Sequence, residues 1–293
     1  MPDARLIPPG SEELFVEASG GRYRVLRSTR AGPGVPLLLV HGGGSDNAAI
    51  SWYRAFEPLS ADRPLLAADL PGFGYTESVP VTGSAAGMAD QLRELLAALR
   101  IDRVCIAGVS MGGEVALQFA LRHPEACHRL VAVAPGGLVS RIGGPLVHRS
   151  LWLMTLLPDA LLRPLAALSN RFMGAVIRRM VYDPASLPPE VIDEMVREAR
   201  RPGSGMAYGA YNRRSIGPSQ MRNDLLPVVS RITAPSLFFH GEEDGLVPLS
   251  GSAAAAERMP HARLVRVPQC GHWAQLEAHD RFIAEVSRFL REP

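Results

Sequence analysis

Short apolar runs alternate along this chain with segments of helical pattern, and this alternation limits the fold more than any other feature. The apolar runs cover residues 23–27, 37–40, 65–68, 104–107, 130–134, 237–240 and 264–267. Helical periodicity covers residues 84–99, 111–122, 252–259 and 275–290. Several runs are apolar without interruption, as are strands buried on both faces of a parallel sheet. The pattern therefore predicts an α/β fold with a mostly parallel, doubly wound sheet.

The alternation stops between residues 138 and 225, where the sequence has the pattern of helices punctuated by prolines. Because this segment lies between two predicted strands, it is expected to be inserted at one end of the sheet. In open α/β sheets ligands bind at the carboxyl ends of the strands. We therefore predict a core formed by residues 1–137 and 226–293, with a helical cap domain formed by residues 138–225.

The composition excludes several kinds of chemistry. All 31 residues counted as Lys+Arg are arginine, so a Schiff-base lysine, a Ser–Lys dyad and a phosphate-binding Walker lysine cannot form. The three cysteines are widely spaced and form no CxxC, which disfavours a disulfide framework and a zinc site. A net charge of +2 gives no indication of nucleic-acid binding. We expect neither a metal nor a cofactor.

Two segments bear on location. Residues 1–11 have no apolar region typical of a signal peptide. The longest apolar stretch, residues 151–168, is interrupted by two prolines, an aspartate and an arginine, which makes it unsuitable as a membrane span. We therefore expect a cytoplasmic protein with no membrane or nucleic-acid partner. Its expected partner is a small-molecule substrate, and a homodimer stays open.

The pentapeptide Gly108-Val109-Ser110-Met111-Gly112 has the form G-x-S-x-G. It follows an apolar run and precedes a helical segment. A strand that turns sharply into a helix presents its serine in a strained, exposed position, and glycines allow the backbones around it to approach. The motif therefore predicts a nucleophile elbow that carries Ser110.

A serine needs a base to become a nucleophile, and the base needs an acid to orient it. Asp244 and His272 each follow a predicted strand, so both are expected at the carboxyl end of the sheet. The chain order Ser110, Asp244, His272 is that of α/β-hydrolases. Glu242 and Glu243 are rivals for the acid. We predict these three residues as a catalytic triad.

The segment His41-Gly42-Gly43-Gly44 also follows a predicted strand. Glycines there allow backbone N–H groups to approach a developing oxyanion. The predicted oxyanion hole consists of the amides of Gly43 and Met111, with Gly42 nearby. A nucleotide-binding glycine loop is the rival, but neither G-x-G-x-x-G nor a following Gly-Lys-Ser/Thr is present.

Together these motifs resemble the α/β-hydrolase superfamily, and the resemblance spans nearly the whole chain. The loop 69–74, DLPGFG, resembles a structural loop of the family. Within it the chain is similar to the meta-cleavage-product hydrolases, which cut carbon–carbon bonds in vinylogous diketo acids from aromatic catabolism. The triple glycine, PGGL at 135–138, MVYD at 180–183 and CGHW at 270–273 support this. The resemblance implies a capped serine hydrolase.

Three positions depart from the pattern of that group. Val109 stands where the group has asparagine, immediately before the nucleophile. Met195 stands where its cap carries an arginine for the substrate carboxylate, and Ser45-Asp46 replaces Pro-Gly after the triple glycine. A polar anion-binding pair has become apolar, and burying a carboxylate without such partners is costly. We therefore predict hydrolysis of a carboxylic ester or lactone of a small, largely apolar substrate through an acyl-enzyme.

The substrate pocket is expected to include Val109, Trp152, Met195 and Trp273. Two alternative functions stay open. One is carbon–carbon bond hydrolysis of a meta-cleavage-type diketo acid, which faster turnover of a coloured dienoate than of simple esters would favour. The other is a non-catalytic ligand-binding protein of the α/β-hydrolase fold, which would leave Ser110 unlabelled by a fluorophosphonate.

Overall fold

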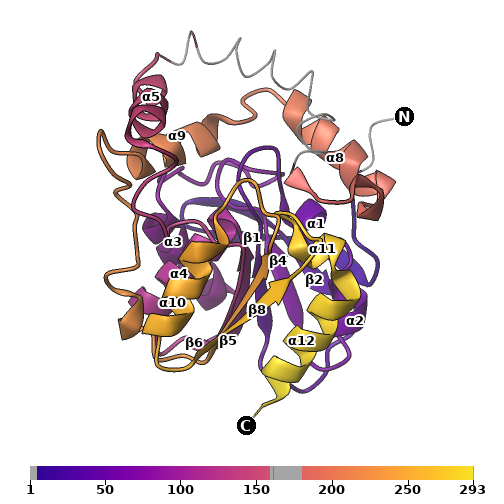
Figure 1. Cartoon of the computed structure of the whole chain (residues 1–293). Coiled ribbons are helices and arrows are strands. Elements are labelled where there is room, and N and C mark those ends of the chain that lie inside the picture. The colour runs from indigo at the N-terminus through magenta and orange to yellow at the C-terminus, as the bar shows by residue number, and fades with distance from the viewer. Residues whose placement is uncertain (1–4, 159–160, 162–179, 293) are drawn as a thin grey trace.

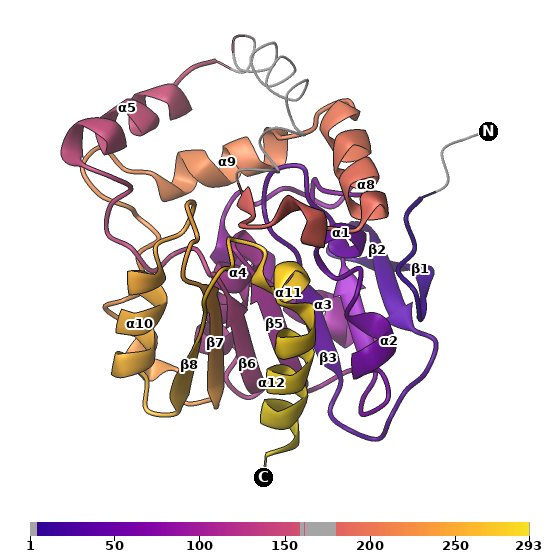
Figure 2. The ribbon, with the colours of Figure 1, turned by 45° about the vertical axis from the view of Figure 1, so that its right-hand side comes forward.

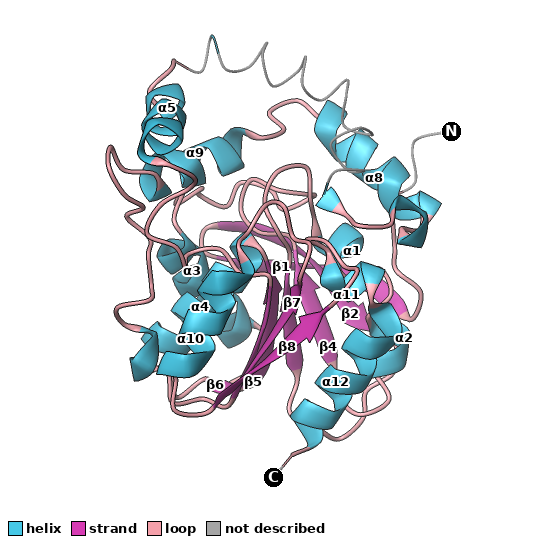
Figure 3. Ribbon diagram, in the orientation of Figure 1, coloured by secondary structure: helices cyan, strands magenta, loops and turns pink. Residues whose placement is uncertain are grey.

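An eight-stranded sheet runs through the centre of the molecule (Figure 1, Figure 3). This computed structural model describes residues 5–158, 161 and 180–292. In spatial order the strands are β1 (Ser11–Ala18), β2 (Gly21–Ser28), β4 (Leu65–Ala68), β3 (Leu37–Val40), β5 (Val104–Val109), β6 (Cys127–Val133), β7 (Ser236–Gly241) and β8 (Ala262–Val267). The pairs β1–β2 and β2–β4 are antiparallel, and all pairs from β4 to β8 are parallel. The predicted fold class is confirmed.

Helices cover both faces of this sheet (Figure 2). One face carries α3 (Ala85–Ala98), α4 (Met111–Arg122) and α10 (Leu249–Arg258). The other carries α1 (Ala48–Ser51), α2 (Phe56–Leu59), α11 (Ala274–Glu277) and α12 (His279–Arg291). The short 3₁₀ helix η2 (Val229–Arg231) precedes β7.

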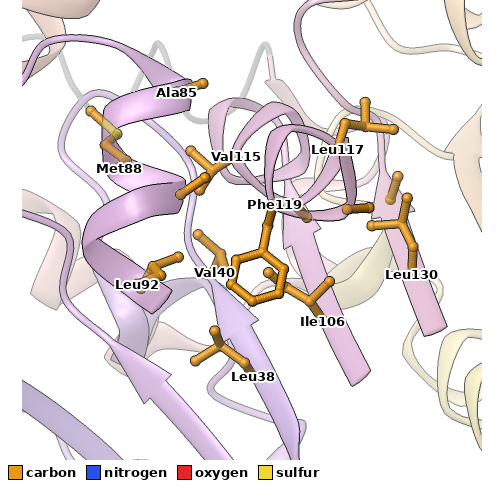
Figure 4. Close-up of a cluster of buried hydrophobic side chains, with 14 of the residues drawn as sticks. Leu38, Val40, Ala85, Met88, Leu92, Ile106, Val115, Leu117, Phe119 and Leu130 are labelled. Atoms are coloured by element: carbon orange, nitrogen blue, oxygen red, sulfur yellow. The ribbon is translucent and has the colours of Figure 1, made fainter. Parts of the chain in front are cut away.

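The central strands supply both core layers, because successive side chains of a strand point to opposite faces. In β3, Leu38 and Val40 pack with Phe119 of α4, as Figure 4 shows. Leu37 and Leu39 belong to the cluster on the other face. Complete burial of one such side chain stabilises the fold by about 1.5–3 kcal/mol. This explains why the predicted strands are apolar without alternation.

The seven predicted strands are confirmed with shifts of a few residues at their ends. β1 escaped prediction because it is a half-buried edge strand in which three glutamates interrupt the apolar residues. The helix predicted over 275–290 is broken at Ala278, whose φ of −103° and ψ of 44° are not helical. The break separates α11 from α12.

Helices also lie beyond the carboxyl end of the parallel strands, between β6 and β7 (Figure 2). They are α5 (Pro145–Thr155), η1 (Pro184–Ser186), α8 (Pro189–Arg200) and α9 (Met206–Ser215). Residues 159–160 and 162–179 of the predicted cap, including part of the apolar stretch 151–168, lie outside the described residues. The division into core and cap domains stays a prediction. In the described part of the chain, no helix has the length and apolarity to cross a membrane.

Candidate active site

Ser110 occupies the sharp turn between β5 and α4. Its φ of 57° and ψ of −120° are unusual for a residue with a side chain, and such a conformation costs on the order of 1–3 kcal/mol. Two hydrogen bonds hold it: the Ser110 N–H donates to the Val133 carbonyl at 2.9 Å, and the Gly136 N–H donates to the Ser110 carbonyl at 2.9 Å. This is the strand-to-helix turn that the sequence predicts.

The two glycines of the motif are required by close backbone contacts. A Cβ at Gly108 would lie 2.0 Å from the carbonyl oxygen of Gly112. A Cβ at Gly112 would lie 2.3 Å from the carbonyl oxygen of His41. Neither position can accept a side chain without moving the backbone. The turn at Ser110 is thereby packed directly against the His41 loop.

His272 and Asp244 form a buried pair. The His272 Nδ1 lies 2.7 Å from Asp244 Oδ2, and their side chains are 3% and 0% exposed. Because Nδ1 faces the carboxylate, Nε2 is the ring nitrogen left for the reaction. The rival acid Glu243 instead accepts a hydrogen bond from the Cys270 N–H at 2.9 Å. Among the described residues Ser110 has no hydrogen bond to His272, and such contacts commonly tighten only around a substrate.

A second histidine, His240, also contacts the acid. Its Nε2 lies 3.2 Å from Asp244 Oδ2, and its Nδ1 lies 2.8 Å from the Ser252 hydroxyl. Burial alone would raise the pKa of Asp244, but hydrogen bonds from His240 and His272 hold that pKa well below its usual range. Asp244 is therefore an anion throughout the neutral range. By sequence alone, His240 is only the last residue of the predicted strand 237–240.

The structure separates the three backbone amides considered for the oxyanion hole. The Gly42 N–H donates to Asp46 Oδ2 at 2.8 Å, so it is occupied and is not a donor to substrate. The amides of Gly43 and Met111 form no hydrogen bond within the described residues, so both stay candidates. The predicted oxyanion hole thus stays a prediction that rests on Gly43 and Met111, with Gly42 beside them and its amide bound by a buried carboxylate.

Three of the four predicted pocket residues lie together. Val109, Met195 and Trp273 are 0%, 3% and 2% exposed and belong to one buried apolar cluster. Trp152 is half-buried on α5 and lies outside that cluster as the described residues define it. The cluster connects β5, α8 and the segment beside His272.

Helix α9 contacts the glycine loop after β3 through Tyr208. A Cβ at Gly43 would lie 2.3 Å from Tyr208 Cε2, so the aromatic ring packs directly on the glycine. The Tyr208 ring stacks on Tyr211 with 5.7 Å between ring centroids. A larger residue at position 43 would have to displace the Tyr208 ring.

Glu114 is a buried carboxylate on α4, one turn after Ser110. It is 1% exposed, and its Oε2 accepts hydrogen bonds from the Tyr211 hydroxyl and, at 2.6 Å, from Asn223 Nδ2. Burial raises the pKa of Glu114 to about 7, against the lowering effect of these hydrogen bonds. Glu114 thus links α4 to α9, and its pKa lies near neutral pH.

Glu114→Gln is expected to remove a pH dependence of stability. The pKa of Glu114 is about 7 in the fold and 4.5 in its usual range, so between these values the folded state binds more protons. The stabilisation is complete below about pH 4.5 and is lost as the pH rises to about 7, with a total of about 3 kcal/mol. As the pH rises across this range, denaturant unfolding should show the free energy of unfolding of the wild type falling relative to that of Glu114→Gln. Parallel curves would contradict the assignment.

Metal chemistry has no candidate site in the described part of the chain. Residues 5–158, 161 and 180–292 contain no group of three or more His, Cys, Asp or Glu side chains placed to hold a metal ion. The predicted site residues instead provide a hydroxyl at Ser110, an imidazole paired with an anion at His272, and two backbone amides, of Gly43 and Met111, without a hydrogen bond in the described residues. These groups suit attack on a carbonyl carbon.

Comparison with known proteins agrees with this geometry. The sequence pattern of the alpha/beta hydrolase fold family matches residues 35–279. The chain is 30% identical to 2-hydroxymuconate semialdehyde hydrolase from Pseudomonas putida, over 97% of each chain. It is 30% identical to 2-hydroxy-6-oxo-6-phenylhexa-2,4-dienoate hydrolase from Burkholderia cepacia, over 89% of each.

Solved structures show the same similarity. The 2-hydroxy-6-oxo-6-phenylhexa-2,4-dienoate hydrolase of a Rhodococcus strain superposes with a TM-score of 0.76 at 26% identity. That match covers 96% of this chain and 100% of the Rhodococcus chain. Both the sequence relatives and this solved structure include hydrolases of 2-hydroxy-6-oxo-6-phenylhexa-2,4-dienoate.

Proposed function

Because the chain belongs to the α/β-hydrolase fold family, on the branch of the meta-cleavage-product hydrolases, we propose that it hydrolyses a carbon–carbon bond next to a ketone in a small dienoate-type substrate. That the chain is a hydrolase follows from its relatives. The observation that carries the finer proposal is the 30% identity over 97% of the Pseudomonas putida hydrolase. The sequence alone favours ester or lactone hydrolysis, whereas the relatives favour the alternative of carbon–carbon bond hydrolysis.

In this proposal Ser110 Oγ attacks the ketone carbon while His272 Nε2 takes the hydroxyl proton. The negative oxygen that develops is held by the amides of Gly43 and Met111. Collapse of this intermediate breaks the carbon–carbon bond, and His272 returns the proton to the departing carbon. His272 then activates a water that releases the acid from Ser110.

Asp244 supports both halves of this reaction. Its carboxylate accepts the Nδ1 proton of His272, which fixes the tautomer in which Nε2 is the base. Because its pKa is held low, it stays anionic and stabilises the imidazolium that forms. Backbone N–H groups of Leu246 and Val247 bind its other oxygen at 2.8 and 2.9 Å, which keeps the carboxylate in place.

Ester or lactone hydrolysis is the second candidate, and two residues favour it. Val109 and Met195 stand where the resemblance expects an asparagine and an arginine for the substrate carboxylate. Both are buried among apolar side chains. A carboxylate placed against them would lose its hydration without gaining a partner.

A direct comparison of substrates tests the two candidates. We expect kcat/KM for a 2-hydroxy-6-oxo-dienoate to exceed that for a p-nitrophenyl ester of similar size by at least about tenfold, which corresponds to about 1.4 kcal/mol of transition-state stabilisation. Decay of the dienoate absorbance and release of p-nitrophenolate measure the two reactions. A reversed ratio would reject carbon–carbon cleavage and support the ester or lactone substrate.

A further inference from the structure

We propose that Asp46 is a positioning residue that fixes the oxyanion loop, residues 41–47, in the orientation that catalysis needs. The inference rests on the proposed serine-hydrolase mechanism, because it concerns the amide donors that face the oxyanion. In the described part of the chain Asp46 forms no hydrogen bond with Ser110, Asp244 or His272, and by sequence alone it is only a departure from the pattern of the resembling group. Its surroundings give it a more specific role.

Asp46 is the centre of a buried hydrogen-bond cluster. Asp46 is only 2% exposed. Oδ2 accepts hydrogen bonds from the Gly42 N–H at 2.8 Å and from the Ser51 hydroxyl at 2.6 Å. Oδ1 accepts from the Asn47 N–H at 2.8 Å. Burial raises the pKa of Asp46, while the hydrogen bonds from Ser51, Gly42 and Asn47 counteract that rise.

Gly42 is held from both sides. Asp46 binds its N–H, and His41 Nδ1 lies 2.7 Å from its carbonyl oxygen. The other ring nitrogen of His41 accepts the Leu70 N–H at 2.9 Å, so Nδ1 carries the proton and donates to Gly42. Neither peptide unit that meets at Gly42 can therefore rotate without breaking a buried hydrogen bond.

This arrangement sets the direction of the Gly43 amide. In a trans peptide the carbonyl of one residue and the N–H of the next point in opposite directions, and no peptide bond in the described chain is cis. With the Gly42 carbonyl on His41, the Gly43 N–H must point away from His41. Gly42 itself adjoins the nucleophile, since a Cβ built on it would lie 3.5 Å from Ser110 Cβ.

The same cluster reaches the cap through Asn47. The Asn47 side-chain oxygen caps α1 by accepting the Ile50 N–H at 3.1 Å. Its Nδ2 donates to Glu194 Oε1 of α8 at 3.3 Å. Asp46 thus lies where the oxyanion loop, α1 and the cap helix meet, which gives the loop a rigid support.

Loss of this support should appear in kcat rather than in KM, because oxyanion stabilisation acts mainly in the transition state. Removal of a complete oxyanion donor costs about 10²–10³ in kcat. A misdirected donor loses part of that, so Asp46→Ala is expected to lower kcat by about 10- to 100-fold with KM within about threefold. The rate of Ser110 labelling by a fluorophosphonate should fall in parallel.

Asp46→Asn separates positioning from general stability. Its amide oxygen can take the place of Oδ2 and accept from Gly42 and Ser51, so kcat should stay within about fivefold of wild type. Its NH₂ then faces the Asn47 N–H, so Tm should fall. Asp90→Ala is the matched control, since it removes a carboxylate from a surface pair with Arg122 and should leave kcat unchanged.

Steady-state kinetics on a p-nitrophenyl ester, fluorophosphonate labelling and thermal unfolding of these full-length variants test the proposal. An Asp46→Ala enzyme with kcat within twofold of wild type, or with its loss confined to KM, would overturn it. So would an Asp46→Asn enzyme as impaired as Asp46→Ala. If Asp46→Ala does not fold, Ser51→Ala decides, with a threefold or larger fall in kcat expected and an unchanged kcat overturning the idea. A wild-type protein inert to ester, dienoate and probe would instead reject the proposed function.

Discussion

Replacement of Ser110 by alanine is expected to lower kcat by at least about 10⁴-fold while the protein stays folded. The hydroxyl forms no hydrogen bond within the described residues, so its removal leaves no buried partner unsatisfied. Alanine keeps the strained backbone at this position, held by the same bonds to Val133 and Gly136. Catalysis loses its nucleophile, and only substrate binding and the oxyanion donors remain.

Steady-state kinetics on the dienoate and on the p-nitrophenyl ester measure this loss, and circular dichroism verifies folding. Ser150→Ala is the control, since Ser150 is exposed and its hydroxyl donates to the Leu146 carbonyl within α5. Equal loss on both substrates would show that one site performs both reactions. More than about 1% residual activity in the Ser110 variant would assign the nucleophile to another residue.

The sequence predicted those parts of the fold and the site that local patterns encode. The runs at 37–40 and 65–68 coincide with β3 and β4 because unbroken apolar tetrapeptides have few places other than the centre of a sheet. Ser110 follows β5 directly, Asp244 lies three residues after β7, and His272 lies five residues after β8. The carboxyl ends of parallel strands share one edge, so topology alone places all three residues at that edge.

The remaining parts depend on contacts between residues far apart in the chain. Glu114 meets a tyrosine 97 positions away and an asparagine 109 positions away. Asn47 meets Glu194 across 147 positions. No periodicity marks such pairs, and a single acidic residue in a helix normally indicates a solvated face. The role of Asp46 was missed for a related reason, since its partners are mainly backbone amides, which every sequence contains.

Replacement of Asp244 by asparagine is expected to lower kcat by about 10⁴-fold, close to the effect of losing the nucleophile. The asparagine side chain is neutral, so it cannot stabilise the imidazolium that His272 becomes during attack. Its NH₂ can also donate to Nδ1, which would place the imidazole proton on Nε2 and leave no base facing Ser110. His240, which contacts the same carboxylate oxygen, cannot replace it, because a histidine supplies no negative charge.

Glu242→Gln is the matched control. Glu242 is an exposed rival acid two residues before Asp244, so its substitution should leave kcat unchanged.

The Asp244→Asn protein should also lose stability at neutral pH. The wild-type carboxylate has its pKa depressed by folding, so it contributes stability above its ordinary pKa and loses that contribution as the pH falls. The difference in Tm between wild type and Asp244→Asn should therefore shrink on acidification. A variant within tenfold of wild-type kcat, or one no less active than Glu242→Gln, would remove Asp244 from the mechanism and leave His272 oriented by some other group.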